Sequence, residues 1–173
     1  MIRFVSIYKQ SNMKNTFYLI ALAAFLSLTS SCKKDDDVTN EQQVEISLNG
    51  FVSNLVDTPP TSADLSNRVK QYLQSNPSFF FGATVTLLDS AQIATDSPYW
   101  YRSADSLLTT SLMDTAYNIN NQTWLRQAID SGAAIWTDPY FDAGGGNIDM
   151  KTRAVPVIVN GKIIAVATTD LAL

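Results

Sequence analysis

The sequence predicts an α+β domain in which two helices come first and a mostly antiparallel sheet follows. Residues 44–55 and 65–73 each place apolar side chains at helical spacing, which predicts two amphipathic helices. The later part of the chain is rich in β-branched and aromatic residues. There, Asn160-Gly161 joins two apolar runs, 150–159 and 162–169, and favours a tight hairpin because both turn positions need a positive φ.

The two predicted helices have recognisable ends. Thr58-Pro59-Pro60 is expected to stop the first helix, since proline cannot continue a helical backbone. Ser62 can cap the second helix, and Asn76-Pro77 is expected to stop it. Residues 33–43, before the first helix, are polar and predict a linker.

The elements between the helices and the hairpin are less uniform. Residues 79–88 are β-rich and mostly apolar, which predicts a central strand, and Tyr99-Trp100-Tyr101 predicts a short aromatic strand. Residues 103–121 favour neither a helix nor a strand. A third helix is expected over 122–131, with its tryptophan inward and Gly132 at its C-terminal stop.

Composition excludes several kinds of chemistry. The 173-residue sequence has no histidine and one cysteine, so it cannot form a Ser-His-Asp triad, an imidazole-based zinc site or an intrachain disulfide. From Lys33 onward, nine Lys and Arg stand against sixteen Asp and Glu, a net charge of −7. An acidic surface repels the phosphate backbone, so nucleic acid is not an expected partner.

The N-terminal part has the features of an export signal. An almost wholly apolar run over 17–28 follows Met13, which makes a better start than Met1. The run is shorter than the roughly 20 residues that a transmembrane helix needs and matches the core of a signal peptide. Residues 28–32, Leu-Thr-Ser-Ser-Cys, resemble the lipobox of bacterial lipoproteins, which implies cleavage before Cys32 and lipidation of its thiol.

Three parts of the chain follow from these features. We expect a lipoprotein signal peptide over 1–32, a polar tether over 33–43 and a single domain over 44–173. The Lys-Lys-Asp-Asp-Asp run after Cys32 resembles the surface-export tags of lipoproteins in Bacteroidota-like bacteria. This resemblance implies a lipid-anchored protein at the outer membrane, on its periplasmic or its outward face.

A series of short motifs runs through the last third of the chain. They are Trp124-Leu125-Arg126-Gln127-Ala128, Trp136-Thr137-Asp138-Pro139-Tyr140-Phe141-Asp142, Gly145-Gly146-Asn147, Met150-Lys151-Thr152, Val155-Pro156-Val157, Asn160-Gly161-Lys162 and Asp170-Leu171. Their order and spacing resemble the extracytoplasmic Cache (PAS-like, PDC-type) domains of bacterial chemoreceptors, sensor kinases, diguanylate cyclases and sensor protein phosphatases. The likeness extends over about 64–173.

The resemblance implies a non-catalytic fold with N-terminal helices packed on a central antiparallel sheet. A pocket on one face of the sheet would bind amino acids, organic acids or amines. Gln122 stands where the amino-acid-binding branch places an arginine, and Leu125 stands where a tyrosine is common. Asp142 and Asp170 match positions where that branch places carboxylates against the ligand amine.

Asp142 and Asp170 are the leading candidate contacts. Two carboxylates that converge on one pocket would hold an ammonium group through charge-assisted hydrogen bonds. The alternative is that Asp142 caps the turn into the glycine run 144–146, while Asp170 faces water. The glycine run lacks the Gly-Lys-Ser/Thr sequence of a phosphate loop and predicts a hairpin loop that can serve as a pocket lid.

Aromatic and basic residues complete the candidate set. Aromatic side chains can wall a pocket for an organic cation or pack in the core. Basic side chains can hold an anionic group or face solvent. The aromatic candidates are Tyr99, Tyr101, Trp124, Trp136 and Tyr140, and the basic candidates are Arg102 and Arg153.

These observations favour a non-catalytic sensor or co-sensor lipoprotein that binds a small amine- or carboxylate-bearing metabolite outside the cytoplasm. The expected partners are this ligand, the membrane and a separate signal-transducing membrane protein, and neither a cofactor nor a metal is expected. One alternative is a surface interaction or adhesion lipoprotein that uses the fold as a scaffold. Others are a fragment of a longer membrane sensor, and a glycosidase that works with two carboxylates.

Overall fold

Eight strands form one antiparallel sheet in the part of the chain that the computed structural model describes, residues 38–173. Neighbouring strands follow the order β4-β3-β1-β8-β7-β5, while β2 pairs with β1 and β6 pairs with β7. The strands are β1 (Phe80–Leu88), β2 (Ala94–Asp96), β3 (Pro98–Ser103), β4 (Ser106–Ser111), β5 (Ile135–Trp136), β6 (Tyr140–Phe141), β7 (Asp149–Val159) and β8 (Lys162–Ala172).

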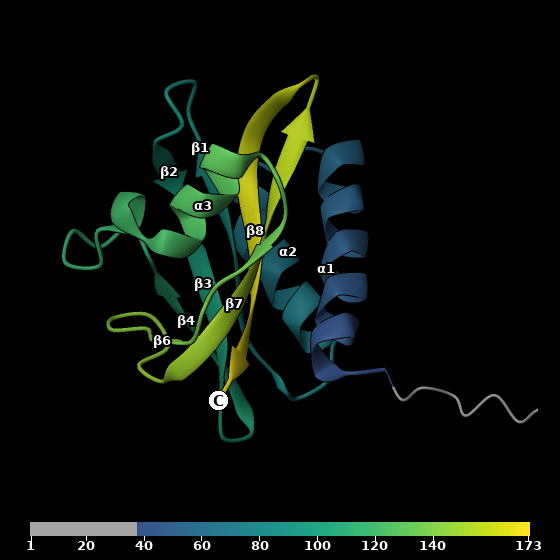
Figure 1. Cartoon of the computed structure of the whole chain (residues 1–173), viewed down its shortest axis with the longest axis vertical. Coiled ribbons are helices and arrows are strands. Elements are labelled where there is room, and N and C mark those ends of the chain that lie inside the picture. Colours follow the sequence, from purple (N-terminus) through teal and green to yellow (C-terminus); the bar gives the residue numbers. More distant parts are fainter. Residues whose placement is uncertain (1–37) are drawn as a thin grey trace, which may run out of the picture. The chain divides into compact units, whose positions relative to one another are not determined.

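Helices cover both faces of this sheet (Figure 1). Helices α1 (Asn40–Asp57) and α2 (Ser62–Gln74) pack on one face. Helix α3 (Thr123–Ser131) follows the short 3-10 helix η1 (Ile119–Asn121) and packs on the opposite face, against β7 and β8. The predicted α+β class, with N-terminal helices on an antiparallel sheet, is confirmed.

Strand alternation divides the interior into two cores, because successive side chains of a strand point to opposite faces. In β8, Ala165 and Ala167 belong to the core under α1 and α2, whereas Val166 between them belongs to the core under α3. The α1–α2 core is almost entirely apolar. The α3 side also buries polar residues, and several of these line a small hollow described below.

Helix α1 begins at Asn40, inside the segment 33–43 predicted to be a tether. Thr39 and Gln42 form a capping box: the Gln42 N–H donates to Thr39 Oγ1 at 3.2 Å, and the Thr39 N–H donates to Gln42 Oε1 at 2.9 Å. The tether prediction is therefore wrong for 40–43, because this capping pair starts the helix ahead of its apolar stripe. The predicted signal peptide and Cys32 lie outside the described residues.

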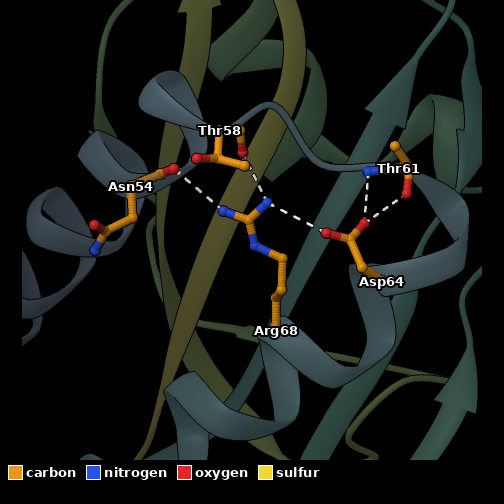
Figure 2. Close-up of polar contacts among 5 residues, drawn as sticks. All are labelled: Asn54, Thr58, Thr61, Asp64 and Arg68. Carbon is orange, nitrogen blue, oxygen red and sulfur yellow. Dashed lines mark hydrogen bonds and ion pairs between the residues drawn. The ribbon is translucent and has the colours of Figure 1, made fainter.

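A polar network holds the corner between α1 and α2 (Figure 2). Arg68 of α2 donates from Nη1 to the carbonyl oxygen of Thr58 at 2.7 Å and from Nη2 to that of Asn54 at 3.2 Å. Asp64 pairs with Arg68 at 3.5 Å and accepts the N–H and the hydroxyl of Thr61, both at 2.7 Å. Arg68 thus supplies a donor to Thr58, the residue after α1, and a second donor to Asn54, whose carbonyl oxygen also accepts the Thr58 N–H at 3.0 Å.

The other predicted elements lie where the sequence places them. These are the central strand β1, the aromatic strand β3, helix α3 and the β7–β8 hairpin, in which Asn160 and Gly161 have φ of 50° and 75°. Residues 103–121, which favour neither a helix nor a strand, contain β4 and η1. No helix within 38–173 is long and apolar enough to cross a membrane.

Candidate ligand-binding site

Polar side chains gather on the α3 side of the central strands. Alternation along β1, β7 and β8 directs Thr84, Thr152, Thr168 and Asp170 to this face. All four are almost completely buried. Buried polar groups need hydrogen-bond partners, and Thr152 and Asp170 bond each other, while Thr84 bonds Ser97 and the carbonyl oxygen of Pro98.

Asp170 of β8 lies at the centre of this cluster and is 3% exposed. The Thr152 hydroxyl on β7 donates to its Oδ1 at 2.6 Å, and the Tyr99 hydroxyl on β3 donates to its Oδ2 at 2.9 Å. Thr152 and Asp170 are register partners in the β7–β8 pair, so the sheet itself brings hydroxyl and carboxylate together. The alternative in which Asp170 faces water is wrong.

Asp142 reaches the same cluster from the loop after β6 and is 5% exposed. The Tyr117 hydroxyl donates to its Oδ1 at 2.9 Å, and the Gly146 N–H donates to its Oδ2 at 2.7 Å. A side chain at Gly145 would collide with this carboxylate, so glycine is required where the loop folds back over it. Asp142 therefore holds the glycine loop, as the capping alternative expects, and also faces the cluster.

Aromatic side chains enclose the two carboxylates. The hydroxyls of Tyr140 and Thr152 share a hydrogen bond of 2.8 Å, and Trp124 Nε1 donates to the Tyr117 hydroxyl at 3.4 Å. Tyr117 bonds Asp142 and Thr152 bonds Asp170, so each carboxylate is linked to an aromatic residue on the α3 side. The aromatic walls and the acids therefore form two hydrogen-bonded groups, one around Asp142 and one around Asp170.

Two adjacent spaces lie at this cluster, which we call the inner hollow and the outer pocket. The inner hollow has a volume of about 10 Å³, the room of roughly one water molecule, and the outer pocket has about 240 Å³. Trp124 and Tyr140 line both spaces. The other residues of the inner hollow are Thr84, Tyr99, Leu112, Tyr117, Asp142, Thr168 and Asp170, and those of the outer pocket are Gln122, Thr123, Gln127, Thr137, Asp138 and Pro139.

The two acids of the site have no basic partner among the described residues. The pKa of Asp170 is raised to about 7: burial is the main cause, the charge of Asp142 adds to the rise, and hydrogen bonds from the hydroxyls of Thr152 and Tyr99 oppose it. Burial also raises the pKa of Tyr99, Tyr117 and Tyr140, so these groups act as neutral donors. None of the ion pairs within residues 38–173 includes either carboxylate.

The structure brings five of the nine predicted contact residues together around the inner hollow. They are Tyr99, Trp124, Tyr140, Asp142 and Asp170. Tyr101 lies one layer behind: its ring stacks on Tyr99 with the centroids 5.5 Å apart, and it lines neither space. The role of the five as ligand contacts stays a prediction.

Arg102 lies away from the site. Its Nε donates to the carbonyl oxygen of Phe80 at 2.9 Å, and its Nη2 donates to those of Leu73 and Asn76 at 2.6 and 2.9 Å. The guanidinium thereby adds donors to carbonyls at and just after the end of α2. The structure corrects the prediction that Arg102 contacts a ligand.

Trp136 and Arg153 also lie away from the site, on the α1 side of the sheet. Thr152 faces the hollow, so alternation turns the next residue, Arg153, to the other side. Glu45 of α1 accepts the Trp136 Nε1–H at 2.8 Å and pairs with Arg153 at 3.5 Å. The structure corrects the pocket prediction for both residues, because they dock α1 on β7.

Several residues of the inner hollow were not predicted from the sequence. Tyr117 is the most important of them, and it lies in the segment 103–121, where no periodic pattern marks an inward side. Thr84 and Thr168, and Thr152 that bonds Asp170 from beside the hollow, lie in predicted strands, but alternation alone does not say which face of a strand carries the site. Only the register between strands assigns them to it.

An antiparallel sheet with N-terminal helices on one face and a polar hollow on the other is the architecture of the PAS-like class of domains. Residues 65–173 match the family described as methyl-accepting chemotaxis protein-like, first PDC sensor domain. The chain belongs to this family, whose members are sensory ligand-binding domains and are generally not catalytic. A comparison with curated protein sequences gives no significant match.

Solved structures show the same fold. The extracellular domain of soHK1S-Z6, described as a histidine kinase, is 28% identical with a TM-score of 0.64 over 77% of this chain and 53% of that chain. The ligand-binding domain of the Campylobacter jejuni chemoreceptor Tlp3, in complex with L-valine, is 16% identical with a TM-score of 0.55 over 73% and 50%. That of the Pseudomonas aeruginosa PAO1 amino acid chemoreceptor PctC, in complex with GABA, is 18% identical with a TM-score of 0.51 over 76% and 56%. The chain thus spans about half the length of these ectodomains.

Proposed function

We propose that this domain is a sensor module that binds a small ammonium-bearing metabolite between Asp142 and Asp170. One observation supports this most strongly: both carboxylates are buried on a single hollow, and none of the ion pairs within 38–173 includes them. Buried charge is costly unless it is paired. A ligand ammonium would supply the missing positive charge through charge-assisted hydrogen bonds.

The walls of the hollow suit the same ligand group. Trp124, Tyr117 and Tyr140 surround the carboxylates, and the faces of aromatic rings attract organic cations. Burial keeps the tyrosine hydroxyls neutral, so they can accept a hydrogen bond from an ammonium group as well as donate to a carboxylate. An anionic group has no basic partner in this lining.

The two adjacent spaces would hold different parts of the ligand, the ammonium group in the inner hollow and the remaining carbon skeleton, its tail, in the outer pocket. The inner hollow has room for an ammonium group but not for a carbon skeleton. The tail must therefore extend past Trp124 and Tyr140 into the outer pocket of about 240 Å³. Rotation of these two side chains would join the spaces.

Thermal unfolding of the purified chain with a panel of primary amines at pH 8 tests the proposal. We expect at least one amine to raise the melting temperature, because a ligand selective for the folded state must do so. Asp142→Asn and Asp170→Asn should each abolish the shift. Asp105→Asn, an exposed acid in the β3–β4 turn, is the matched control and should keep it. A panel without any shift would contradict the proposal.

The near-filled inner hollow favours one competing function. With only about 10 Å³ between the carboxylates, the sheet face is almost closed by its own side chains. A closed face suits a protein that uses the fold as a scaffold for surface interaction or adhesion. In that case no amine would shift the melting temperature, and the Asp142→Asn and Asp170→Asn variants would differ from the parent only in stability.

We also propose a place for the domain in the cell. The lipobox-like run before Cys32 supports a lipid anchor at the outer membrane, and the family supports a role as co-sensor beside a separate signal-transducing membrane protein. The competing arrangement is a portion of a longer membrane sensor. Its support is the match to a first PDC domain and the half-length coverage of the solved ectodomains.

A further inference from the structure

We infer that the site selects amines that lack a carboxylate group and rejects amino acids. This inference rests on the proposed function, because it concerns the tail of a ligand whose ammonium lies between Asp142 and Asp170. It follows from the positions of the basic side chains. Every Lys and Arg of residues 38–173 lies away from both the inner hollow and the outer pocket, and the sequence contains no histidine.

Five of the seven basic side chains in 38–173 are held on the α1–α2 side of the sheet. Arg68 and Arg102 donate to carbonyls at the ends of α1 and α2. Lys70 lies over the ring of Trp100, which itself bonds to α2. Lys151 and Arg153 form ion pairs with Glu41 and Glu45 of α1.

The other two basic side chains are also remote from the ligand spaces. Arg126 does not line the outer pocket; it pairs with Asp130 of its own helix at 3.0 Å and donates to the carbonyl oxygen of Gln92 at 3.4 Å. Lys162 is exposed at the β7–β8 turn. A ligand carboxylate in either space would therefore meet no cationic side chain from the described residues.

The carboxylate of an α-amino acid would weaken binding more than a carboxylate at the end of a long tail would. It is bonded to the carbon that bears the ammonium, so it must enter the neck between Trp124 and Tyr140 together with that group. There it would lose water and lie close to two buried carboxylates, which repel it. A carboxylate farther along the tail would reach the outer pocket, where the one charged residue is Asp138.

The lining of the outer pocket suits uncharged or cationic tails. Gln122, Gln127, Thr123 and Thr137 offer amide and hydroxyl groups, and Trp124 with Pro139 offers apolar surface. An aliphatic, aromatic or hydroxylated tail fits this surface, and a second ammonium would be attracted by Asp138. The ligand class is therefore a primary amine or diamine, such as a decarboxylated amino acid.

Matched pairs that differ only in the carboxylate test this inference. Isothermal titration at pH 8 compares 3-methylbutylamine with leucine, phenethylamine with phenylalanine, and cadaverine with lysine. We expect the amine to bind roughly 30-fold more tightly or better in at least one pair, since the acid leaves a charged group without a partner. Equal or tighter binding of the amino acids would overturn the inference but leave the proposed function intact. Absence of binding by all six compounds would overturn the proposed function as well.

A positive charge added to the outer pocket provides the second measurement. Gln127 is exposed and lines the pocket, so an arginine there can pair with a ligand carboxylate. Gln127→Arg should therefore reduce the gap between amine and amino acid, taken as the ratio of their dissociation constants, at least tenfold. Gln74→Arg, the same change at the end of α2, is the control and should leave the gap unchanged. Gln122→Arg is the second pocket variant. If both pocket variants fold and neither narrows the gap more than the control does, the inference fails.

Discussion

The two acids at the inner hollow each accept a tyrosine hydroxyl but differ in the kind of their second donor. Asp142 accepts a backbone N–H from Gly146, a group that can only donate. Asp170 accepts hydrogen bonds from the hydroxyls of Thr152 and Tyr99, and a hydroxyl can accept as well as donate. The surroundings of Asp170 therefore suit a neutral carboxyl as well as a carboxylate, which agrees with its raised pKa of about 7.

Stability should depend on pH through Asp170. Its pKa is raised by burial from 3.8 to about 7, so between these values the folded chain holds a proton that the unfolded chain releases. The free energy of unfolding should therefore fall as pH rises through this range and level off above it. At about 1.4 kcal/mol per pKa unit, the contribution of Asp170 is roughly 4 kcal/mol at most.

Urea unfolding of the parent and Asp170→Asn from pH 4.5 to pH 8 measures this effect. Asparagine does not titrate, so the difference in unfolding free energy between the two proteins should change with pH by a few kcal/mol. The same difference for Asp105→Asn should stay nearly constant. A pH-independent difference for Asp170→Asn would show that this carboxyl keeps its ordinary pKa in the folded chain.

Helix α1 is tied to its neighbours by polar contacts at several points along its length. Its C-terminal carbonyls accept hydrogen bonds from Arg68 of α2 (Figure 2). Glu45 accepts the Trp136 Nε1–H and pairs with Arg153 of β7. Thr152, the neighbour of Arg153 in β7, bonds Asp170 on the opposite face. One short stretch of β7 therefore connects the candidate site with α1.

Removal of the Arg68 side chain should weaken the corner between the helices. Arg68→Ala leaves the carbonyls of Asn54 and Thr58 without these donors, and we expect the free energy of unfolding to fall by about 1–3 kcal/mol. The free energy of unfolding of Arg68→Lys should lie between those of the parent and Arg68→Ala, because an ammonium lacks the planar fork that reaches two carbonyls. Urea unfolding measures both, with Lys162→Ala as the exposed control, expected within about 0.5 kcal/mol of the parent. An Arg68→Ala variant as stable as the control would contradict this role.

The sheet separates two interiors of different character. The side under α1 and α2 is mainly apolar, with few buried polar groups such as the Tyr72–Thr169 pair, and the side under α3 combines apolar packing with the buried acids. Figure 1 shows α1 and α3 on opposite sides of the β7–β8 hairpin, so this hairpin contributes to both. A sensor of this design can keep a stable core on one face while the other face accommodates a ligand.

The proposed lipid anchor predicts how the complete chain behaves in a bacterial cell. Metabolic labelling with a palmitate analogue should mark the full-length protein and leave Cys32→Ser unlabelled, because the sequence has no other thiol. Ser31→Ala keeps a small residue before the cysteine and should retain the label. Label on Cys32→Ser, or none on the parent protein, would contradict the anchor.

Local sequence patterns were sufficient to predict most of the fold. The signals act over a few residues: apolar residues at helical spacing, prolines after the helices, and Asn160-Gly161. The helices and the β7–β8 hairpin lie where these signals place them. The start of α1 was missed because the Thr39–Gln42 capping box precedes the apolar pattern. The residues of β4 were missed because they are mostly exposed and lack an alternating pattern.

The site depended on information that no local pattern contains. The motif series was enough to select Asp142 and Asp170 as candidates. Their positions on the same hollow, however, depend on the register of β8 against β7 and on the fold of the glycine loop. That register also turned Arg153 toward α1 instead of the ligand spaces. Tyr117 contacts Asp142 in the site although its segment, 103–121, has no helical or strand periodicity in the sequence. Secondary structure follows from interactions between near neighbours in the chain, whereas a binding site is made by residues that only tertiary packing brings into contact.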